Sequence, residues 1–117
     1  MSGFSKSPIL RVTEKGWQLV YRLSYYAVSG EKVVVPAGFD TDLASIPQVF
    51  QAVIAVNDRH RAAAILHDYL YTVQDRPRAQ ADALFLEAMK LSGVRFTQRW
   101  AMYLAVRVGG WLPWSRK

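Results

Sequence analysis

The pattern of apolar and polar positions changes near Pro47. Before it, glycine and proline separate short runs rich in β-branched and aromatic residues. Residues 17–28 form one of these runs, and apolar and polar positions mostly alternate over residues 17–24, which is the period of a half-buried strand. Ser29 and Gly30 then favour a hairpin turn, so residues 32–35 are expected to pair antiparallel with the preceding run. Together with residues 9–13, the pattern predicts a small antiparallel meander of about three strands.

The rest of the chain has helical periodicity. Asp58 is a candidate N-cap for a helix that ends near Val73. Pro77 suits the first turn of the next helix, which should stop at Gly93. A third helix is expected over about residues 97–108, before a pair of glycines.

These elements predict an α+β fold, with a small N-terminal antiparallel β-meander packed against about three C-terminal α-helices. The length of 117 residues fits a single domain. We therefore expect one domain over residues 1–117, with a β-rich part at 1–46 and a helical part at 47–117.

Charge and composition narrow the classes of partner. The net charge is +6 and cysteine is absent, which excludes disulfides, thiolate metal sites and a cysteine nucleophile. The basic residues are scattered apart from two groups, Arg95/Arg99 and Arg107/Arg116/Lys117, and no nucleic-acid-binding motif stands out. We therefore interpret the charge as favouring solubility or an acidic partner, and nucleic acid is not an expected partner.

The hydropathy of the chain bears on membranes and on location. The most apolar stretch, residues 49–56, is far shorter than the roughly 20 residues that cross a bilayer. No integral membrane insertion is therefore expected. The N-terminus lacks the apolar core of a signal peptide, so we expect synthesis in the cytoplasm.

The strongest chemical signal is a histidine-aspartate pair in the first helix. His67 and Tyr71 are four residues apart and share a helix face, whereas Asp68 lies about 100° further round. Asp82 begins a row of core-facing positions in the next helix, and a buried carboxylate needs a partner. His67 is the economical partner, and Asp82 would fix its tautomer and leave the other ring nitrogen as a base toward water. The alternative is that the pair only ties two helices together.

A second set of polar residues lies in the loop over residues 38–47. Asp40, Thr41, Asp42 and Ser45 stand between a strand and a helix, where they could act as caps and turn formers or as ligands. We favour the capping role for Thr41 and Ser45, and both roles stay open for Asp42. With Asp68, the carboxylates Asp42 and Asp40 are candidate ligands for a divalent cation such as calcium.

Two expectations concern other side chains. Trp111 and Trp114 lie in the basic C-terminal tail and should cap the core or contact a partner. His60, between two arginines near a helix start, is expected at the surface.

Four segments in order, GFDTDLASIP, AAAILHDYLY, ADALFLEAM and AMYLAVRVGGW, carry a family resemblance. They resemble an uncharacterised family of phage and prophage proteins with the pattern F-x-T-D-x-A-S-I-P, A-x-x-H-D-x-L-Y and A-D-x-x-F. The resemblance covers residue 35 to the C-terminus. It implies phage origin and a gene among virion or tail-region genes, and it supplies no activity.

A more distant resemblance concerns mechanism. H-D-x-x-Y followed by A-D-x-x-F is similar to the pattern of secreted and parvoviral phospholipases. The resemblance implies that His67 is the base, Asp68 a calcium ligand, Asp82 the orienting carboxylate and Tyr71 a support. The glycine-rich calcium loop of those enzymes and their disulfides are missing here, so convergence on a short pattern remains an alternative.

These observations lead to an expected function. The chain is expected to be a phage virion protein of the tail, baseplate or neck, with a structural or assembly role and other phage structural proteins as partners. The alternative is a metal-assisted hydrolase with a His67-Asp82 dyad that acts on host lipid or peptidoglycan during infection. A third hypothesis is a cytoplasmic factor that modulates the host.

Overall fold

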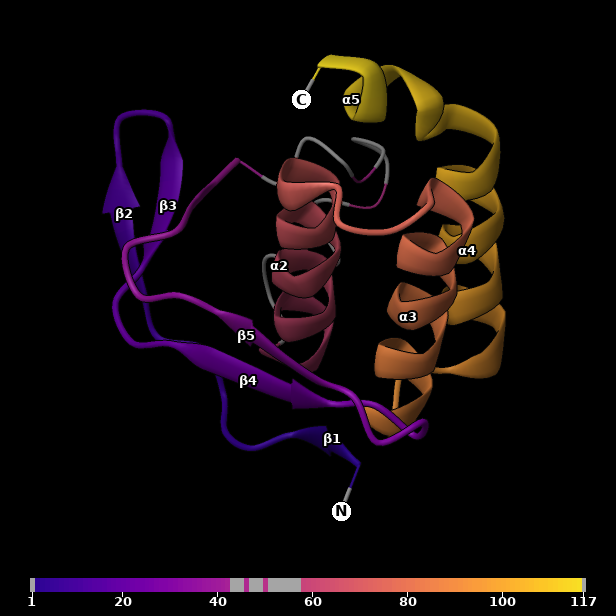
Figure 1. Cartoon of the computed structure of the whole chain (residues 1–117), viewed down its shortest axis with the longest axis horizontal. Coiled ribbons are helices and arrows are strands. Elements are labelled where there is room, and N and C mark those ends of the chain that lie inside the picture. The colour runs from indigo at the N-terminus through magenta and orange to yellow at the C-terminus, as the bar shows by residue number, and fades with distance from the viewer. Residues whose placement is uncertain (1, 43–45, 47–49, 51–57, 117) are drawn as a thin grey trace.

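The computed structural model describes residues 2–42, 46, 50 and 58–116 of the chain. Its strands, in chain order, are β1 (Gly3–Phe4), β2 (Leu10–Thr13), β3 (Gly16–Leu19), β4 (Leu23–Tyr26), β5 (Lys32–Val35) and β6 (Asp40–Thr41). The helices that follow are α2 (Asp58–Val73), α3 (Arg78–Leu91), α4 (Phe96–Gly109) and α5 (Trp111–Arg116) (Figure 1). The predicted α+β class is confirmed.

The strands form two small antiparallel sheets in the orders β1-β4-β5 and β2-β3-β6. The prediction of one continuous strand over residues 17–28 was wrong, because the chain bends after β3 and enters the other sheet as β4. Leu19 and Leu23 are both buried, whereas Tyr21, which should share their face in a straight strand, is 56% exposed. The bend therefore lets both leucines reach the core.

The predicted hairpin is present between β4 and β5. Tyr26 pairs with Lys32 across the turn, and the amide of Gly30 donates to the carbonyl of Ala27 at 3.0 Å. Gly30 has a φ of 97°, which a glycine adopts without strain. The turn residues thus set the register of this pair as the sequence indicated.

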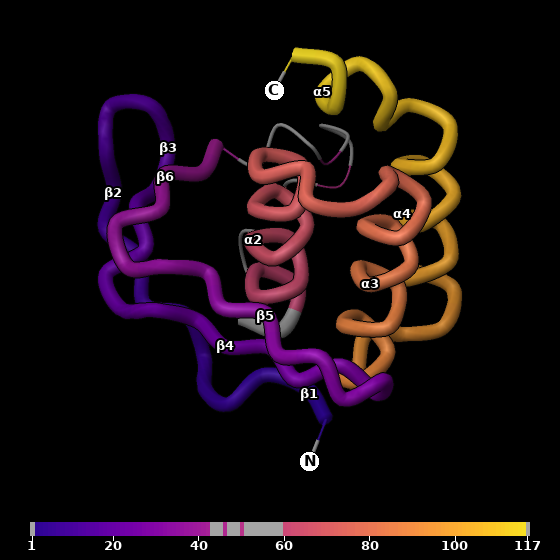
Figure 2. Tube along the Cα trace, viewed as in Figure 1, coloured from indigo at the N-terminus to yellow at the C-terminus, as the bar shows by residue number. Residues whose placement is uncertain are grey.

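Helix α2 is the centre of the fold. Figure 2 shows it between the strands and α3, and α3 packs in turn against α4. Residues 62–68 of α2 are all buried, and the alanines at 62–64 let neighbouring elements approach closely. The end of α2 at Val73, the start of α3 after Pro77 and the extent of α4 agree with the predicted helices. No helix in the described part of the chain is long and apolar enough to span a membrane.

The C-terminal tail folds as the short helix α5. Trp114 packs edge-to-face on Tyr71 with ring centroids 5.0 Å apart, and Gln74 Nε2 donates to the Trp114 carbonyl at 2.7 Å. Trp111 is 60% exposed. One tryptophan therefore caps the core, and the other faces solvent.

His60 is buried, with 7% of its surface exposed, so its expected place at the surface was wrong. Its Nε2 lies 3.3 Å from Gln98 Oε1 of α4. The flanking arginines suggested a solvent-exposed position, but His60 begins the mostly buried part of α2 that extends through Leu70.

Candidate functional site

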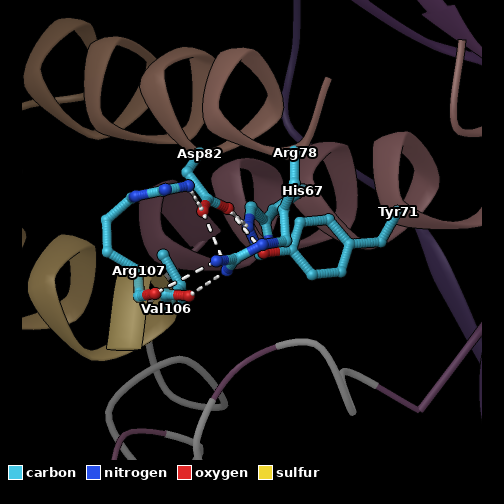
Figure 3. A network of polar contacts seen from close by, with 6 residues as sticks. All are labelled: His67, Tyr71, Arg78, Asp82, Val106 and Arg107. Atoms are coloured by element: carbon cyan, nitrogen blue, oxygen red, sulfur yellow. Dashed lines mark hydrogen bonds and ion pairs between the residues drawn. The ribbon is translucent and has the colours of Figure 1, made fainter. Parts of the chain in front are cut away.

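The predicted contact between His67 and Asp82 is present, with Nε2 of His67 2.7 Å from Oδ1 of Asp82 (Figure 3). Both side chains are fully buried. Helices α2 and α3 are joined by residues 74–77 alone, so α3 runs back along α2. This short connection places Asp82, in the second turn of α3, beside His67, in the second half of α2.

Tyr71 completes one side of the site. Its hydroxyl donates to the same oxygen, Oδ1 of Asp82, at 2.7 Å. The His67 ring lies between the rings of Tyr71 and Phe85, with centroid distances of 4.2 Å and 4.6 Å. The hydrogen bond to Asp82 and the two aromatic neighbours together fix the orientation of the imidazole.

Two arginines occupy the other side of the carboxylate. Arg107 Nη1 donates to Oδ2 of Asp82 at 2.7 Å, and Arg78 Nη1 lies 3.6 Å from the same oxygen. Arg78 also donates to the carbonyls of Val106 (3.0 Å) and Arg107 (3.3 Å), at the end of α4. The network thus joins α2, α3 and α4 through one buried aspartate.

Sequence reasoning missed both arginines as site residues. Arg107 was placed only in a basic group of the C-terminal region, and Arg78 was not singled out. The spacing of Arg78 and Asp82, four residues apart on one helix, was a usable signal. Arg107 had no such local signal, because its position depends on how α4 packs against α3.

Gly110 is a steric requirement of this network. It is buried between α4 and α5, and a Cβ there would collide with the Tyr71 hydroxyl and the Val106 carbonyl and come within 3.0 Å of Arg78 Nη1. The backbone at the α4–α5 junction therefore closes directly over the tyrosine and arginine that contact Asp82.

The charge states follow from burial and hydrogen bonding. Burial lowers the pKa of His67, and this outweighs the opposing effect of Asp82, so the ring is neutral at neutral pH. Burial alone would raise the pKa of Asp82, but the hydrogen bonds from His67, Tyr71 and Arg107 outweigh it and hold that pKa below its usual value. Because an ionised carboxylate only accepts, Nε2 of His67 must donate, and Nδ1 carries the lone pair of the ring.

Asp68 lies in a separate polar contact. Its Oδ2 accepts a hydrogen bond of 2.7 Å from Oγ1 of Thr41, and both residues are buried. Asp40 and Asp42 are exposed. The structure thus brings Thr41, which was expected to act only in capping or a turn, against Asp68, and ties β6 to α2.

A divalent cation held by Asp68, Asp42 and Asp40 stays a prediction. Among the residues that the structure describes, no three His, Cys, Asp or Glu side chains gather as a metal site requires. These residues do not by themselves supply the ligand set of a calcium ion, which takes six to eight oxygens. Ser45, the remaining candidate of this loop, lies outside the described residues.

Fold and site together define a class: an α+β protein in which a buried histidine-aspartate pair joins its two central helices. The chain belongs to the family described as a protein of unknown function (DUF1353), which matches residues 17–106. The matched region contains His67, Tyr71 and Asp82, and the family description names no activity. Phage origin, which the motif resemblance implied, stays a prediction.

One curated relative is an uncharacterized protein, y4jT, of Sinorhizobium fredii (strain NBRC 101917 / NGR234). It is 31% identical over 96 residues, which cover 80% of this chain and 29% of that protein. The chain therefore spans less than a third of the length of this relative. No solved structure matches the chain.

Proposed function

We propose that this chain is a hydrolase in which His67 is the general base and Asp82 orients it. The observation that carries the proposal is the arrangement at Asp82, where Oδ1 accepts from both Nε2 of His67 and the hydroxyl of Tyr71. A histidine base needs one fixed tautomer, with a lone pair on the nitrogen that takes the proton. In this arrangement that nitrogen is Nδ1.

The charges around Asp82 favour this role over a counterion role for His67. Arg107 and Arg78 already compensate the carboxylate, so a protonated histidine is not needed to neutralise it. The hydrogen bond from His67 then serves to position the ring. The competing interpretation is that the whole network only ties the helices together. Variants of His67 and Asp82 distinguish the catalytic interpretation from the structural one.

The proposed reaction is the hydrolysis of an ester or amide in host lipid or cell wall. His67 would take a proton from water through Nδ1 as the oxygen attacks the carbonyl carbon, and would return it to the leaving group. Because His67 has no exposed surface in the structure, the proposal requires an opening that admits water and substrate. These steps use His67 alone as the base, and the predicted cation at Asp68 is tested separately.

The experiment compares His67→Gln and Asp82→Asn with the unmodified chain on phospholipid vesicles and on purified peptidoglycan. Loss of a general base is expected to lower the rate of fatty-acid or muropeptide release by about 10²–10⁴-fold in protein that circular dichroism shows to be folded. His60→Gln is the matched control, because it removes the other histidine of α2 without touching Asp82. An unmodified chain that hydrolyses neither substrate, or variants that lose activity only as far as they unfold, would rule the proposal out.

The predicted cation can be tested separately. Addition of calcium should raise the melting temperature of the unmodified chain, chelation should reverse this, and Asp68→Asn should abolish it. A melting temperature that is indifferent to calcium and chelator would remove the cation from the proposal and leave the dyad in place.

We also propose a role as a phage virion component of the tail, baseplate or neck, which is compatible with a hydrolase. The F-x-T-D-x-A-S-I-P and H-D-x-L-Y motifs, which resemble those of a phage and prophage family, motivate it. Mass spectrometry of purified particles should find the chain at a constant ratio to the tail proteins. Its absence from particles made in cells that produce it would contradict this role.

A further inference from the structure

The net charge of the chain resides entirely in its last 30 residues. Beyond Glu87 the sequence contains six basic residues and no acidic one. The remaining nine basic residues, all within residues 1–87, are balanced by the nine acidic residues of that part. Helices α4 and α5 therefore lie in a segment of charge +6, while the strands, α2 and the larger part of α3 lie in a segment of zero net charge.

The same segment exposes a continuous apolar stripe along α4. Every fourth residue of this helix is a large apolar side chain open to solvent: Phe96 (64% exposed), Trp100 (38%), Leu104 (57%) and Val108 (77%). On α5, Trp111 and Leu112 are also exposed, at 60% and 40%. A stripe of this spacing normally faces the core, but here Met102 and Val106 already fill that position on the other side of α4.

Basic side chains border the stripe. The guanidinium of Arg99 lies 5.3 Å from the centre of the Phe96 ring, and Arg95 and Arg116 are exposed near the two ends. Beside the first turns of α4, a groove of about 530 Å³ is lined by Lys90 and Arg99 together with Phe96 and Trp100. Its one acidic lining residue, Glu87, already accepts hydrogen bonds from Tyr25 and the amide of Val28. Cationic and aromatic groups thus meet at one place on the surface.

We propose that the outer face of α4 and α5 docks on an anionic lipid bilayer. A helix face with tryptophan and aliphatic side chains, flanked by arginine and lysine, suits the boundary between headgroups and acyl chains. Anionic headgroups supply the negative charge that the segment lacks, while the stripe enters the apolar layer. A second copy of the chain fits less well, because it would bring one segment of net positive charge against another. This inference does not depend on a catalytic role for His67.

The test is co-sedimentation of the full chain with phosphatidylcholine vesicles, with and without about 30% phosphatidylglycerol, the kind of anionic surface that attracts basic segments. We expect binding to the anionic vesicles only, with a blue shift of tryptophan emission. Raising the salt to about 1 M should weaken it, because the Debye length falls from about 10 Å to about 3 Å. Replacing Arg95 and Arg116 by glutamine should lower the partition coefficient by about five-fold for each charge removed.

The apolar part is tested with Leu104→Ser/Val108→Ser, which should weaken vesicle binding by at least about ten-fold without loss of helix content. Ile9→Ser/Val12→Ser is the matched control, since it removes two exposed apolar side chains near and within β2 and should leave binding unchanged. Several results would overturn the proposal: equal binding to neutral and anionic vesicles, no binding to either, binding to duplex DNA in place of vesicles, or a dimer that Leu104→Ser/Val108→Ser dissolves.

Discussion

At the scale of single residues, Asp82 organises the interior of the helical part. Its two oxygens accept from an imidazole, a phenol and a guanidinium, with a second guanidinium close by. A buried carboxylate is stable only while such partners are present, because desolvating an unpaired charge is costly. Replacing a residue that contacts Asp82 from another helix should therefore lower the stability of the fold.

Arg107→Met should destabilise the fold by about 2–4 kcal/mol. It removes the closest cationic partner of a fully buried carboxylate, and the loss is moderated because Arg107 is about one-third exposed and Arg78 remains. Urea denaturation measures the free energy of unfolding of the variant and of the unmodified chain. Arg95→Met, which removes an exposed arginine at the start of the same helix, should stay within about 0.5 kcal/mol. Equal stability of the two variants would show that the ion pair does not matter.

The two adjacent glycines at the end of α4, Gly109 and Gly110, should respond oppositely to alanine. Gly110→Ala forces a methyl group against Tyr71 and the backbone of Val106, and should cost about 1–3 kcal/mol. At Gly109 a methyl group would meet no atom within 4 Å, so Gly109→Ala should be neutral or stabilise α4 by up to about 1 kcal/mol. Thermal unfolding of both variants checks this, and a tolerated Gly110→Ala would contradict the close approach.

The lowered pKa of His67 predicts a pH dependence of stability. The folded state binds fewer protons than the unfolded state below the ordinary pKa of 6.5, so stability is full above that pH and falls as the pH drops below it. The free energy of unfolding should change by at most about 1.4 kcal/mol per pH unit through this group. The lowered pKa of Asp82 acts only at lower pH, where its contribution is lost below about 3.8.

Urea unfolding between about pH 7.5 and pH 5, on either side of the ordinary histidine pKa, measures this dependence. His67→Gln should flatten the curve, and His60→Gln should retain it. A His67→Gln variant that keeps the slope of the unmodified chain would assign the effect to other groups.

At the scale of elements, the helices and the β4–β5 hairpin could be predicted, but the division of the strands into two sheets could not. Periodicity over ten or more residues, with Pro77 and Gly93 as boundaries, defines a helix from local information. The run over residues 17–28 has strand periodicity, but the bend between β3 and β4 depends on which side chains reach the core. That is a tertiary property, which a local period does not contain.

The same distinction applies to the site. His67, Tyr71 and Asp82 could be brought together from helical spacing and a short connection, which leave few arrangements. Arg107 and Gly110 belong to the site through the packing of α4 and α5, and no sequence spacing encodes that packing. The site residues within the hairpin of α2 and α3 could thus be predicted, whereas those at the end of α4 could not.

The two tryptophans of the short helix α5 should contribute unequally to stability, because one packs on the core and the other faces solvent. Trp114→Ala removes the edge-to-face contact with Tyr71 and should cost about 1–3 kcal/mol, less than for a fully buried tryptophan because Trp114 is only partly buried. Trp111→Ala should change stability by less than about 0.5 kcal/mol, since Trp111 is mostly exposed. Thermal melts of the two variants provide the comparison, and a larger loss in Trp111→Ala would refute this division.

At the scale of the whole molecule, α4 connects the interior network with the outer surface. Its Arg107 donates to Asp82, and its exposed side chains include Trp100 and Leu104 of the apolar stripe. The basic segment and the buried dyad therefore meet at one helix. A hydrolase with lipid as substrate would benefit from this arrangement, because the helix that we propose to meet the bilayer also contacts the aspartate that we propose to orient the base.

The most direct test of the central claim is the ¹⁵N nuclear magnetic resonance spectrum of the His67 ring. At neutral pH we predict a neutral ring with its proton on Nε2, and Asp82→Asn should move the proton to Nδ1, because the amide donates where the carboxylate accepted. His60→Gln assigns the signals by leaving only one histidine. A charged ring at neutral pH, or a proton on Nδ1 in the unmodified chain, would contradict the account of His67 as a base oriented by Asp82.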